Sequence, residues 1–258
     1  MKATLIVSIY KNITALRTIL RSLQLQTEQD FELIISEDGE DTAISNFIKA
    51  YSFSWPTQHL TQPDMGWQKN KALNRAIMAA KTEWLIFIDG DCVLHPRFVE
   101  MHVRYKQDNV LLAGKRIKLN KDLSQQLIDG DKKLKLIPYL FNRRGCRYVE
   151  EAFFISLSHW LRRPVRHLVG SNMSMSKQAL LSINGFDEEY TLPAVGEDYD
   201  IEWRLLAKGY KIVSLRNLAI QYHLYHKENW IDQSENMKYC ATQQSNNEIV
   251  CKNGIKKL

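Results

Sequence analysis

The feature that most constrains the fold of this sequence is the alternation of short apolar runs with amphipathic stretches over its first 119 residues. Apolar residues recur at helical spacing in the stretches between the runs, as at Leu16, Ile19 and Leu23. The runs themselves, rich in β-branched and aromatic residues, are predicted strands at 4–10, 31–38, 59–61, 84–88 and 110–119. Near-continuous apolar strands separated by amphipathic helices are typical of parallel sheets covered on both faces. The sequence therefore predicts an α/β fold with a mostly parallel central sheet and helices on both faces.

Composition limits the class of protein. The chain has 258 residues, of which 45% are hydrophobic and 25% charged, as in ordinary globular proteins. No apolar run approaches the roughly 18 residues needed to cross a bilayer, and the first apolar run is too short for a signal peptide. The four cysteines form no C-x-x-C pair, so free thiols are favoured over a zinc cluster. We therefore expect a cytoplasmic protein, soluble or peripheral to the membrane.

The net charge of +6 indicates an anionic partner, such as a nucleotide, a nucleic acid or a membrane surface. Basic residues are interspersed with acids, and no RNA-recognition or helix-turn-helix signature is present, which argues against nucleic acid. Between 156 and 168, Trp160 and Leu161 stand beside three arginines. Aromatic residues beside arginines suit peripheral contact with a membrane. They suit a solvated helix or a lid over a ligand site equally well.

Polar residues follow three of the predicted strands at their carboxyl ends. They are Ser8-Ile9-Tyr10, Glu37-Asp38-Gly39 and Asp89-Gly90-Asp91. In open α/β sheets, ligands bind in the crevice outside the carboxyl ends of the strands, so these side chains are expected to face one crevice. No G-x-G-x-x-G follows the first strand and no P-loop lysine motif is present, which argues against a dinucleotide or P-loop site.

Asp89 and Asp91 place two like charges across a glycine at the end of a core strand. One interpretation is a polar turn with glycine at its tip. The other is a site for a hard divalent cation, Mn²⁺ or Mg²⁺, which offsets the repulsion and leaves coordination positions for substrate phosphates. His223 and His226, on or beside the last predicted strand, offer a further ligand.

A second acidic cluster occurs in GEDYDIEW, from 196 to 203. Glu197 and Asp198 stand where the cap and first-turn acids of a helix belong. The cluster nevertheless holds more acid than one helix start needs, and a carboxylate in a cleft can serve as a general base. Basic residues, among them Lys69 and Lys71, surround another predicted helix start, where backbone N–H groups favour phosphate. We assign Lys71 to donor binding; an exposed basic helix end is the alternative.

Taken together, seven motifs in this order resemble the family 2 glycosyltransferases with the GT-A fold. The resemblance is to bacterial surface-polysaccharide (lipopolysaccharide) members whose carboxy-terminal segment is like that of the β-1,4-galactosyltransferases. The motifs are VSIYKN (7–12), SEDGE (36–40), GWQKNKALNRAI (66–77), FIDGDC (87–92), GSNMSMSK (170–177), NGFDEEY (184–190) and GEDYDIEWRL (196–205). The resemblance implies one GT-A (Rossmann-like) domain over 1–230, followed by a tail at 231–258. A nucleotide-sugar half would span 1–119 and an acceptor half, with a basic and aromatic insertion, 120–230.

The resemblance also implies roles for individual residues. Asp91 and His223 would bind the metal directly, and Asp89 would lie near both the metal and the donor ribose. Asp198 would deprotonate the acceptor hydroxyl, Glu197 would hold the acceptor sugar, and Trp67 would stack on a sugar or base. The nucleoside pocket would be lined by Ser8, Ile9 and Tyr10, with Asp38 accepting hydrogen bonds from the base.

These roles imply an inverting, metal-dependent transferase. It would move a sugar from a nucleotide-diphosphate donor, we expect a UDP-sugar, to a saccharide or lipid-linked acceptor in surface-polysaccharide biosynthesis. The cation would act as a Lewis acid on the departing diphosphate. Two alternatives stay open: a nucleotidyltransferase, and an inactive relative that binds nucleotide-sugars or carbohydrate.

Overall fold

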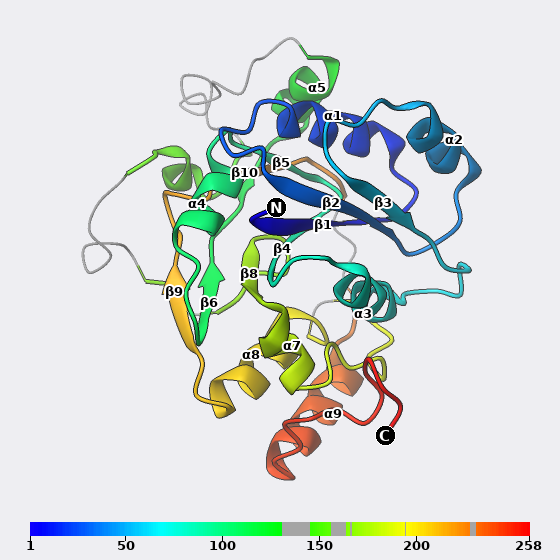
Figure 1. The fold of residues 1–258 in the computed structure, drawn as a ribbon, viewed down its shortest axis with the longest axis vertical. Helices are drawn as coiled ribbons and strands as arrows, with labels where there is room; N and C mark the ends of the chain where they lie inside the picture. The colour runs from blue at the N-terminus through cyan, green and yellow to red at the C-terminus, as the bar shows by residue number, and fades with distance from the viewer. Residues whose placement is uncertain (131–144, 156–163, 166, 194, 228–230) are drawn as a thin grey trace.

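The computed structural model describes residues 1–130, 145–155, 164–165, 167–193, 195–227 and 231–258. Its centre is a seven-stranded sheet with the strand order β3-β2-β1-β4-β8-β6-β9 (Figure 1). The strands are β1 (Ala3–Ile9), β2 (Phe31–Glu37), β3 (Thr57–Leu60), β4 (Trp84–Asp89), β6 (Val110–Ala113), β8 (Met173–Ser176) and β9 (Lys211–Ser214). All neighbours pair in parallel except β8, which runs antiparallel to both β4 and β6. The expected mostly parallel α/β sheet is therefore confirmed.

Helices cover both faces of this sheet, because alternate strand residues point to opposite sides. Leu5 and Val7 belong to one core cluster with α1, α2 and α4, whereas Ile6 belongs to another with α3, α7 and α8. The helices on the first face are α1 (Ile13–Leu23), α2 (Thr42–Ala50) and α4 (Phe98–Arg104). Those on the second face are α3 (Lys69–Ala79), α7 (Lys177–Ser182) and α8 (Asp198–Ala207). None of the helices in the described residues is long and apolar enough to span a bilayer.

A small second sheet lies beside the carboxyl end of β4. It has the order β5-β10-β7, formed by β5 (Cys92–Leu94), β10 (Gln221–His223) and β7 (Ile117–Lys118). The expected single strand at 110–119 is wrong, because the chain leaves the main sheet after β6 and joins the small sheet as β7. Gly114 lies in that connection, where a Cβ atom would come within 2.3 Å of the Asn172 side chain. The small sheet packs with α5 (Lys121–Asp129) and the short helix η1 (Val149–Ala152).

The segment at 231–258, expected as a surface tail, contains the helix α9 (Ser234–Ser245) and is partly buried. Cys240 and Cys251 are each 2% exposed, and Asn184 donates hydrogen bonds to the carbonyl groups of Cys251 and Lys256. Helix α9 lies against the chain that leads into α8, at the lower end of the molecule in Figure 1. The segment therefore packs onto the folded body.

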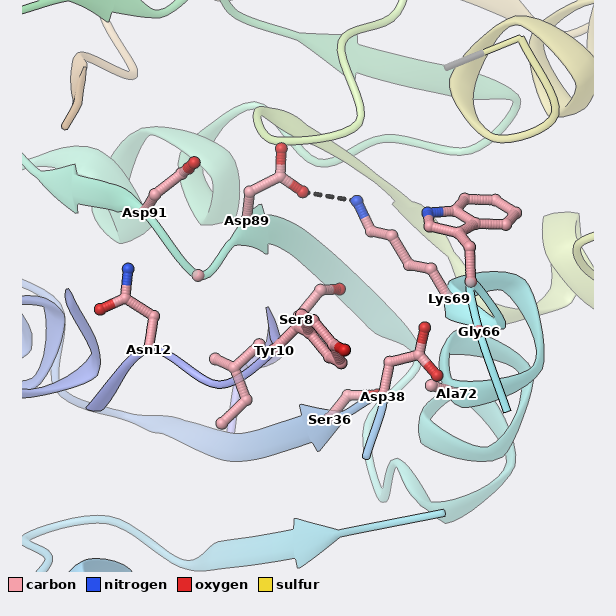
Figure 2. A pocket seen from close by; sticks show the side chains of 13 residues that line it. Ser8, Tyr10, Asn12, Ser36, Asp38, Gly66, Lys69, Ala72, Asp89 and Asp91 are labelled. Carbon is pink, nitrogen blue, oxygen red and sulfur yellow. Dashed lines mark hydrogen bonds and ion pairs between the residues drawn. The ribbon is translucent and has the colours of Figure 1, made fainter. Parts of the chain in front are cut away.

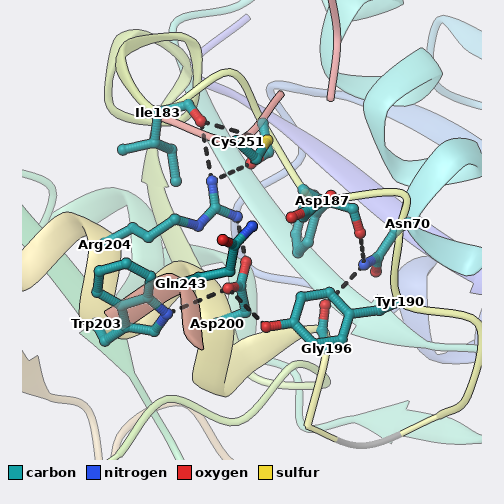
Figure 3. A network of polar contacts seen from close by, with 12 residues as sticks. Asn70, Ile183, Asp187, Tyr190, Gly196, Asp200, Trp203, Arg204, Gln243 and Cys251 are labelled. Carbon is teal, nitrogen blue, oxygen red and sulfur yellow. Dashed lines mark hydrogen bonds and ion pairs between the residues drawn. The ribbon is translucent and has the colours of Figure 1, made fainter. Parts of the chain in front are cut away.

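A buried polar network fixes the start of α8 (Figure 3). The Arg204 guanidinium, 1% exposed, pairs with Asp200 and donates to the carbonyl groups of Ile183 and Gly185. Asp200 also accepts hydrogen bonds from Tyr190 and Trp203. A buried charge with this many partners holds its neighbours in a fixed geometry. The Asp198 end of α8 is thus held by contacts with the chain between 183 and 190.

Candidate active site

A cavity of about 400 Å³ lies at the carboxyl ends of β1, β2 and β4 (Figure 2). Ser8, Ile9, Tyr10, Asp38 and Asp89, all assigned to the donor from the sequence, line it together. They converge because parallel neighbours end at the same edge: Ser8 is in register with Ser36 on one side and with Asp89 on the other. The structure thus brings the three polar strand ends into one crevice.

Asp38 is held rigidly at the base of this cavity. It is 8% exposed, and one carboxylate oxygen accepts from the Gln62 amide at 2.7 Å while the other accepts from the Gln68 backbone N–H at 2.8 Å. Each carboxylate oxygen has more than one acceptor site, so both retain capacity for a ligand N–H. The Asp38 side chain is therefore preorganised as an acceptor at the cavity wall.

The two aspartates of the D-G-D motif have separate partners. Gly90 packs so closely on β1 that a Cβ atom there would lie 2.6 Å from the Ser8 carbonyl oxygen. Asp89 ends β4, and its carboxylate lies 2.6 Å from the Lys69 ammonium and 3.4 Å from the Arg116 guanidinium. These two cations offset the charge that Asp89 places beside Asp91.

Asp91 instead faces two histidines. One of its oxygens lies 3.3 Å from Nε2 of His223 and 3.3 Å from Nε2 of His226. Burial alone would raise the pKa of Asp91, but His226 and His223 outweigh it and lower that pKa to about 2. Burial also lowers the pKa of His223 and so favours its neutral, metal-binding form. The sequence left open which histidine accompanies Asp91, and the structure places both there.

The donor set of these three residues fits a divalent cation. One ligand atom from each of Asp91, His223 and His226 lies within 4.8 Å of the others, as do single atoms of Asp89, Asp91 and Cys92. An ionised carboxylate with two imidazole nitrogens is a mixed oxygen and nitrogen set that accepts Mn²⁺, among other metals. The chemistry of the residues is therefore compatible with the predicted metal.

Glu197 and Asp198 lie at the start of α8, yet the Glu197 side chain makes no capping hydrogen bond. It lies 2.6 Å from the Lys69 ammonium, so Lys69 bridges Glu197 and Asp89. Burial raises the pKa of Glu197 to about 7 despite the opposing effect of Lys69. Asp198 accepts hydrogen bonds from the backbone N–H groups of Gly170 and Tyr199, and burial raises its pKa. A buried carboxylate with a raised pKa is a plausible proton acceptor near neutral pH.

A second, larger cavity of about 1340 Å³ adjoins the first. Both are lined by Trp67, Lys69 and Asp89. The larger cavity is also lined by Glu197 and Asp198 from α8, and by His223 and His226 from the end of β10. One continuous space therefore joins the nucleoside-sized cavity, the candidate metal ligands and the candidate base.

The structure does not support the assignment of Lys71 to donor binding. It is exposed on α3 and lines neither cavity, whereas Lys69 points into the site (Figure 2). Successive helix residues are about 100° apart, so positions 69 and 71 lie on nearly opposite sides of α3. Arg116, which pairs with Asp89, was not predicted from the sequence. The proposed membrane contact at 156–168 falls mostly on residues outside those that the structure describes.

Comparison with known proteins identifies two families. The model of glycosyl transferase family 2 matches residues 4–181, and the model of the N-terminal domain of galactosyltransferase matches residues 151–227. Chondroitin synthase of Escherichia coli is 26% identical over 213 residues, 77% of this chain and 31% of that protein. Hyaluronan synthase of Pasteurella multocida is 24% identical over 204 residues, 71% of this chain and 20% of that protein. The chain thus spans less than a third of the length of these two relatives.

Solved structures share the fold. S. aureus TarS, solved with UDP-GlcNAc, superposes with a TM-score of 0.64 at 15% identity, over 94% of this chain and 66% of that one. The mannosyltransferase PcManGT of Pyrobaculum calidifontis, solved with GDP-Man and Mn²⁺, gives 0.59 at 12% identity, over 96% and 62%. The expected GT-A fold is confirmed. Because the first family model covers more than half of the sequence, the chain belongs to glycosyl transferase family 2.

Proposed function

We propose that this glycosyltransferase moves a sugar from a UDP-sugar to a hydroxyl group of a saccharide or lipid-linked acceptor in surface-polysaccharide biosynthesis, with inversion and with a divalent cation. The observation that carries the proposal is the shared space around Lys69 and Asp89. It joins the donor-side cavity to Asp198 on one side and to the Asp91 and histidine cluster on the other. A donor, a cation and an acceptor could therefore meet in one place.

The donor-side residues support a nucleoside in the smaller cavity. Asp38 offers fixed acceptor oxygens to the N–H of a base, and Tyr10, 53% exposed, offers a ring at the cavity mouth. Among the structural neighbours, TarS was solved with UDP-GlcNAc, which supports uridine as the nucleoside. Asp89 and Lys69 lie farther along, where the ribose and diphosphate would follow.

The cation, Mn²⁺ or Mg²⁺, would be held by Asp91 and His223, with His226 as a further ligand and Asp89 beside them. When bound, it supplies a positive charge that offsets the charge developing on the leaving diphosphate. The neighbouring Lys69 and Arg116 add two positive groups of the protein itself at the same edge. Two structural neighbours were solved with Mn²⁺, which supports this choice of metal.

The acceptor-side residues support a single displacement. Asp198 would take the proton of the acceptor hydroxyl as its oxygen attacks the anomeric carbon, and Gly170 N–H keeps the carboxylate oriented for that step. Glu197 would accept a hydrogen bond from another acceptor hydroxyl, and Trp67, which lines both cavities, would stack on a sugar face. One displacement without a glycosyl-enzyme intermediate inverts the anomeric configuration.

Hydrolysis of the donor in the absence of acceptor tests this proposal. We would screen UDP-, GDP-, dTDP- and CMP-sugars with Mn²⁺ and with EDTA, for the wild type and for Asp91→Ala. The expected result is slow release of UDP from one donor with Mn²⁺, abolished by EDTA and by Asp91→Ala. Asp108→Ala, at an exposed aspartate that lines neither cavity, is the matched control and should retain activity. If no nucleotide-sugar is hydrolysed or bound in a metal-dependent way, the proposal is wrong.

A further inference from the structure

One wall of the larger cavity comes from α9, a helix outside both family matches. Those matches end at residues 181 and 227, whereas α9 spans Ser234–Ser245. Five residues of α9 or its N-terminal cap line the cavity, each three or four positions from another: Gln233, Met237, Cys240, Ala241 and Gln244. Side chains at this spacing share one helix face. This face, which we call the α9 stripe, is therefore a continuous strip of the cavity wall.

The opposite face of α9 anchors the helix. Asn236, 5% exposed, donates to the Leu192 carbonyl at 3.0 Å, and Gln243 donates to the Tyr239 hydroxyl. Tyr239 in turn donates to the Asp187 carboxylate at 2.9 Å and packs edge-on against Tyr190. These contacts tie α9 to the segment that leads into α8. The position of the stripe relative to Asp198 is thereby fixed by the fold.

The α9 stripe carries no charge. Two amides stand at its ends, and Met237, 60% exposed, and Ala241 lie between them. Pyranose rings combine apolar C–H faces with hydroxyl groups, so apolar side chains flanked by amides are chemically complementary to them. An aliphatic lipid would offer no hydrogen bonds to the amides of Gln233 and Gln244. An anionic group would find no cation on the α9 stripe.

None of the charged side chains that line the cavity belongs to the α9 stripe, and most of them face one another. Lys69 bridges Asp89 and Glu197, Arg116 contacts Asp89, and both histidines face Asp91. The volume of about 1340 Å³ also exceeds the range of roughly 300–1,000 Å³ typical of pockets for drug-sized ligands. The space therefore extends beyond the single sugar that Asp198 and Glu197 would hold.

From these observations we propose that the α9 stripe is a subsite for the second and following residues of a neutral oligosaccharide acceptor. The inference rests on the proposed glycosyl transfer and makes it more specific. The sugar that carries the attacking hydroxyl lies against Glu197 and Asp198, and the sugars behind it lie along Gln233, Met237 and Gln244. Acceptor choice is then set by a helix outside the family-matched residues.

Binding to an array of neutral and anionic glycans, from mono- to hexasaccharides, with UDP and Mn²⁺ present, tests the inference. We expect signal from neutral glycans that rises from one sugar to three. Met237→Glu should weaken that binding about tenfold or more, because a buried charge would face the apolar ring surface. Gln244→Ala should weaken it less. Lys238→Glu, which places the same side chain one position further round the helix and outside the cavity, should have no effect.

Two outcomes overturn the inference: absence of signal from every neutral glycan, and binding that depends neither on chain length nor on Met237. Acceptor-free donor hydrolysis separates this failure from failure of the proposed function. Wild type and Lys238→Glu should hydrolyse donor equally, because position 238 lines neither cavity. Hydrolysis without neutral-glycan binding contradicts the subsite alone, whereas loss of hydrolysis in the wild type contradicts the transferase reaction.

Discussion

The smaller cavity, which we propose for the donor, and the larger one, which we propose for the acceptor, share Trp67, Lys69 and Asp89, but the chain builds them differently. The donor side consists mainly of loops that follow three adjacent parallel strands, and its residues lie within the first 91 positions. The larger cavity collects residues between 67 and 244 from strands, loops and the three helices α3, α8 and α9. One cavity follows from the topology of the sheet, and the other depends on long-range packing.

This difference suggests that the wall of the larger cavity can change in evolution while the smaller cavity stays the same. Strand ends meet wherever parallel strands end together, so the donor side needs little beyond the sheet. The acceptor wall instead depends on buried polar anchors such as Arg204–Asp200 and Tyr239–Asp187, which lie away from the reacting groups. A change in α9 could therefore alter the acceptor without disturbing the donor site.

The largest expected effect is on the acceptor side. Asp198→Asn keeps the shape of the side chain but removes the proton acceptor, so the rate of transfer should fall about 10²–10⁴-fold. Binding of UDP with Mn²⁺, measured by calorimetry, should change less than twofold, because Asp198 does not line the donor cavity. Asp232→Asn, an exposed aspartate at the start of the C-terminal segment, is the control. If Asp198→Asn reduced UDP binding as much as transfer, the proposal that donor and acceptor bind in separate cavities would be wrong.

Lys69 is the residue at which the two sides meet, and Lys69→Met should affect both. The change leaves Glu197 and Asp89 facing each other without their shared cation, and breaking a buried ion pair costs about 3 kcal/mol. Glu197, whose pKa is already about 7, can escape that cost by taking up a proton. Urea unfolding should therefore show a larger loss of stability at pH 8 than at pH 5.

Lys71→Met is the matched control, since Lys71 lies two positions along α3 and is exposed. It should leave the free energy of unfolding, UDP affinity and transfer near their wild-type values. Equal effects of the two substitutions, or a loss of stability that does not depend on pH, would contradict the bridging role of Lys69.

The contrast between Lys69 and Lys71 also shows what sequence can reveal. The strand ends and D-G-D were predictable because the strand period is read from local sequence, and because parallel strands end at one edge of a sheet. The lysine was not, because a shift of two residues in helix phase exchanges the buried and exposed sides. Helix α9 was missed because its buried residues are Asn236, Cys240 and Gln243 rather than an apolar stripe. The position of α9 is determined by tertiary hydrogen bonds, which cannot be read from a local sequence pattern.

Gly170 should give a smaller and selective effect. A Cβ atom there would lie 2.3 Å from Oε1 of Glu197, and its N–H donates to Asp198. Gly170→Ala should therefore displace the acceptor-side carboxylates and slow transfer about tenfold, while acceptor-free donor hydrolysis stays unchanged. The test is to measure the rate of transfer for Gly170→Ala, for Glu197→Ala and for the double variant. The double variant should be no slower than Glu197→Ala alone; additive losses would place the defect elsewhere.

The smallest expected effect concerns His102, whose hydrogen bonds hold the segment that carries Arg116. His102 of α4 is fully buried, with Nδ1 2.8 Å from Ser174 Oγ and Nε2 3.1 Å from Asn172 Oδ1. The Asn172 amide donates to the carbonyl groups of Lys115 and Ala219, so its oxygen must accept from His102. The neutral imidazole then donates from Nε2 and accepts at Nδ1 from Ser174. This chain of bonds holds the segment that carries Arg116 against β8.

Burial lowers the pKa of His102 from 6.5 to about 3, which makes folding depend on pH. Between these two values the unfolded chain binds a proton that the folded chain does not, so this contribution to stability is complete above pH 6.5 and falls as pH decreases. One proton corresponds to about 1.4 kcal/mol per pH unit, or roughly 2 kcal/mol between pH 6.5 and pH 5. His102→Gln removes the titrating group while an amide retains donor and acceptor atoms. Between pH 6.5 and pH 5, the free energy of unfolding measured with urea should fall by about 2 kcal/mol more for the wild type than for the variant. Equal losses would mean that the folded protein already accepts the proton on His102 at pH 5, and that the junction between the two cavities tolerates a charged imidazole.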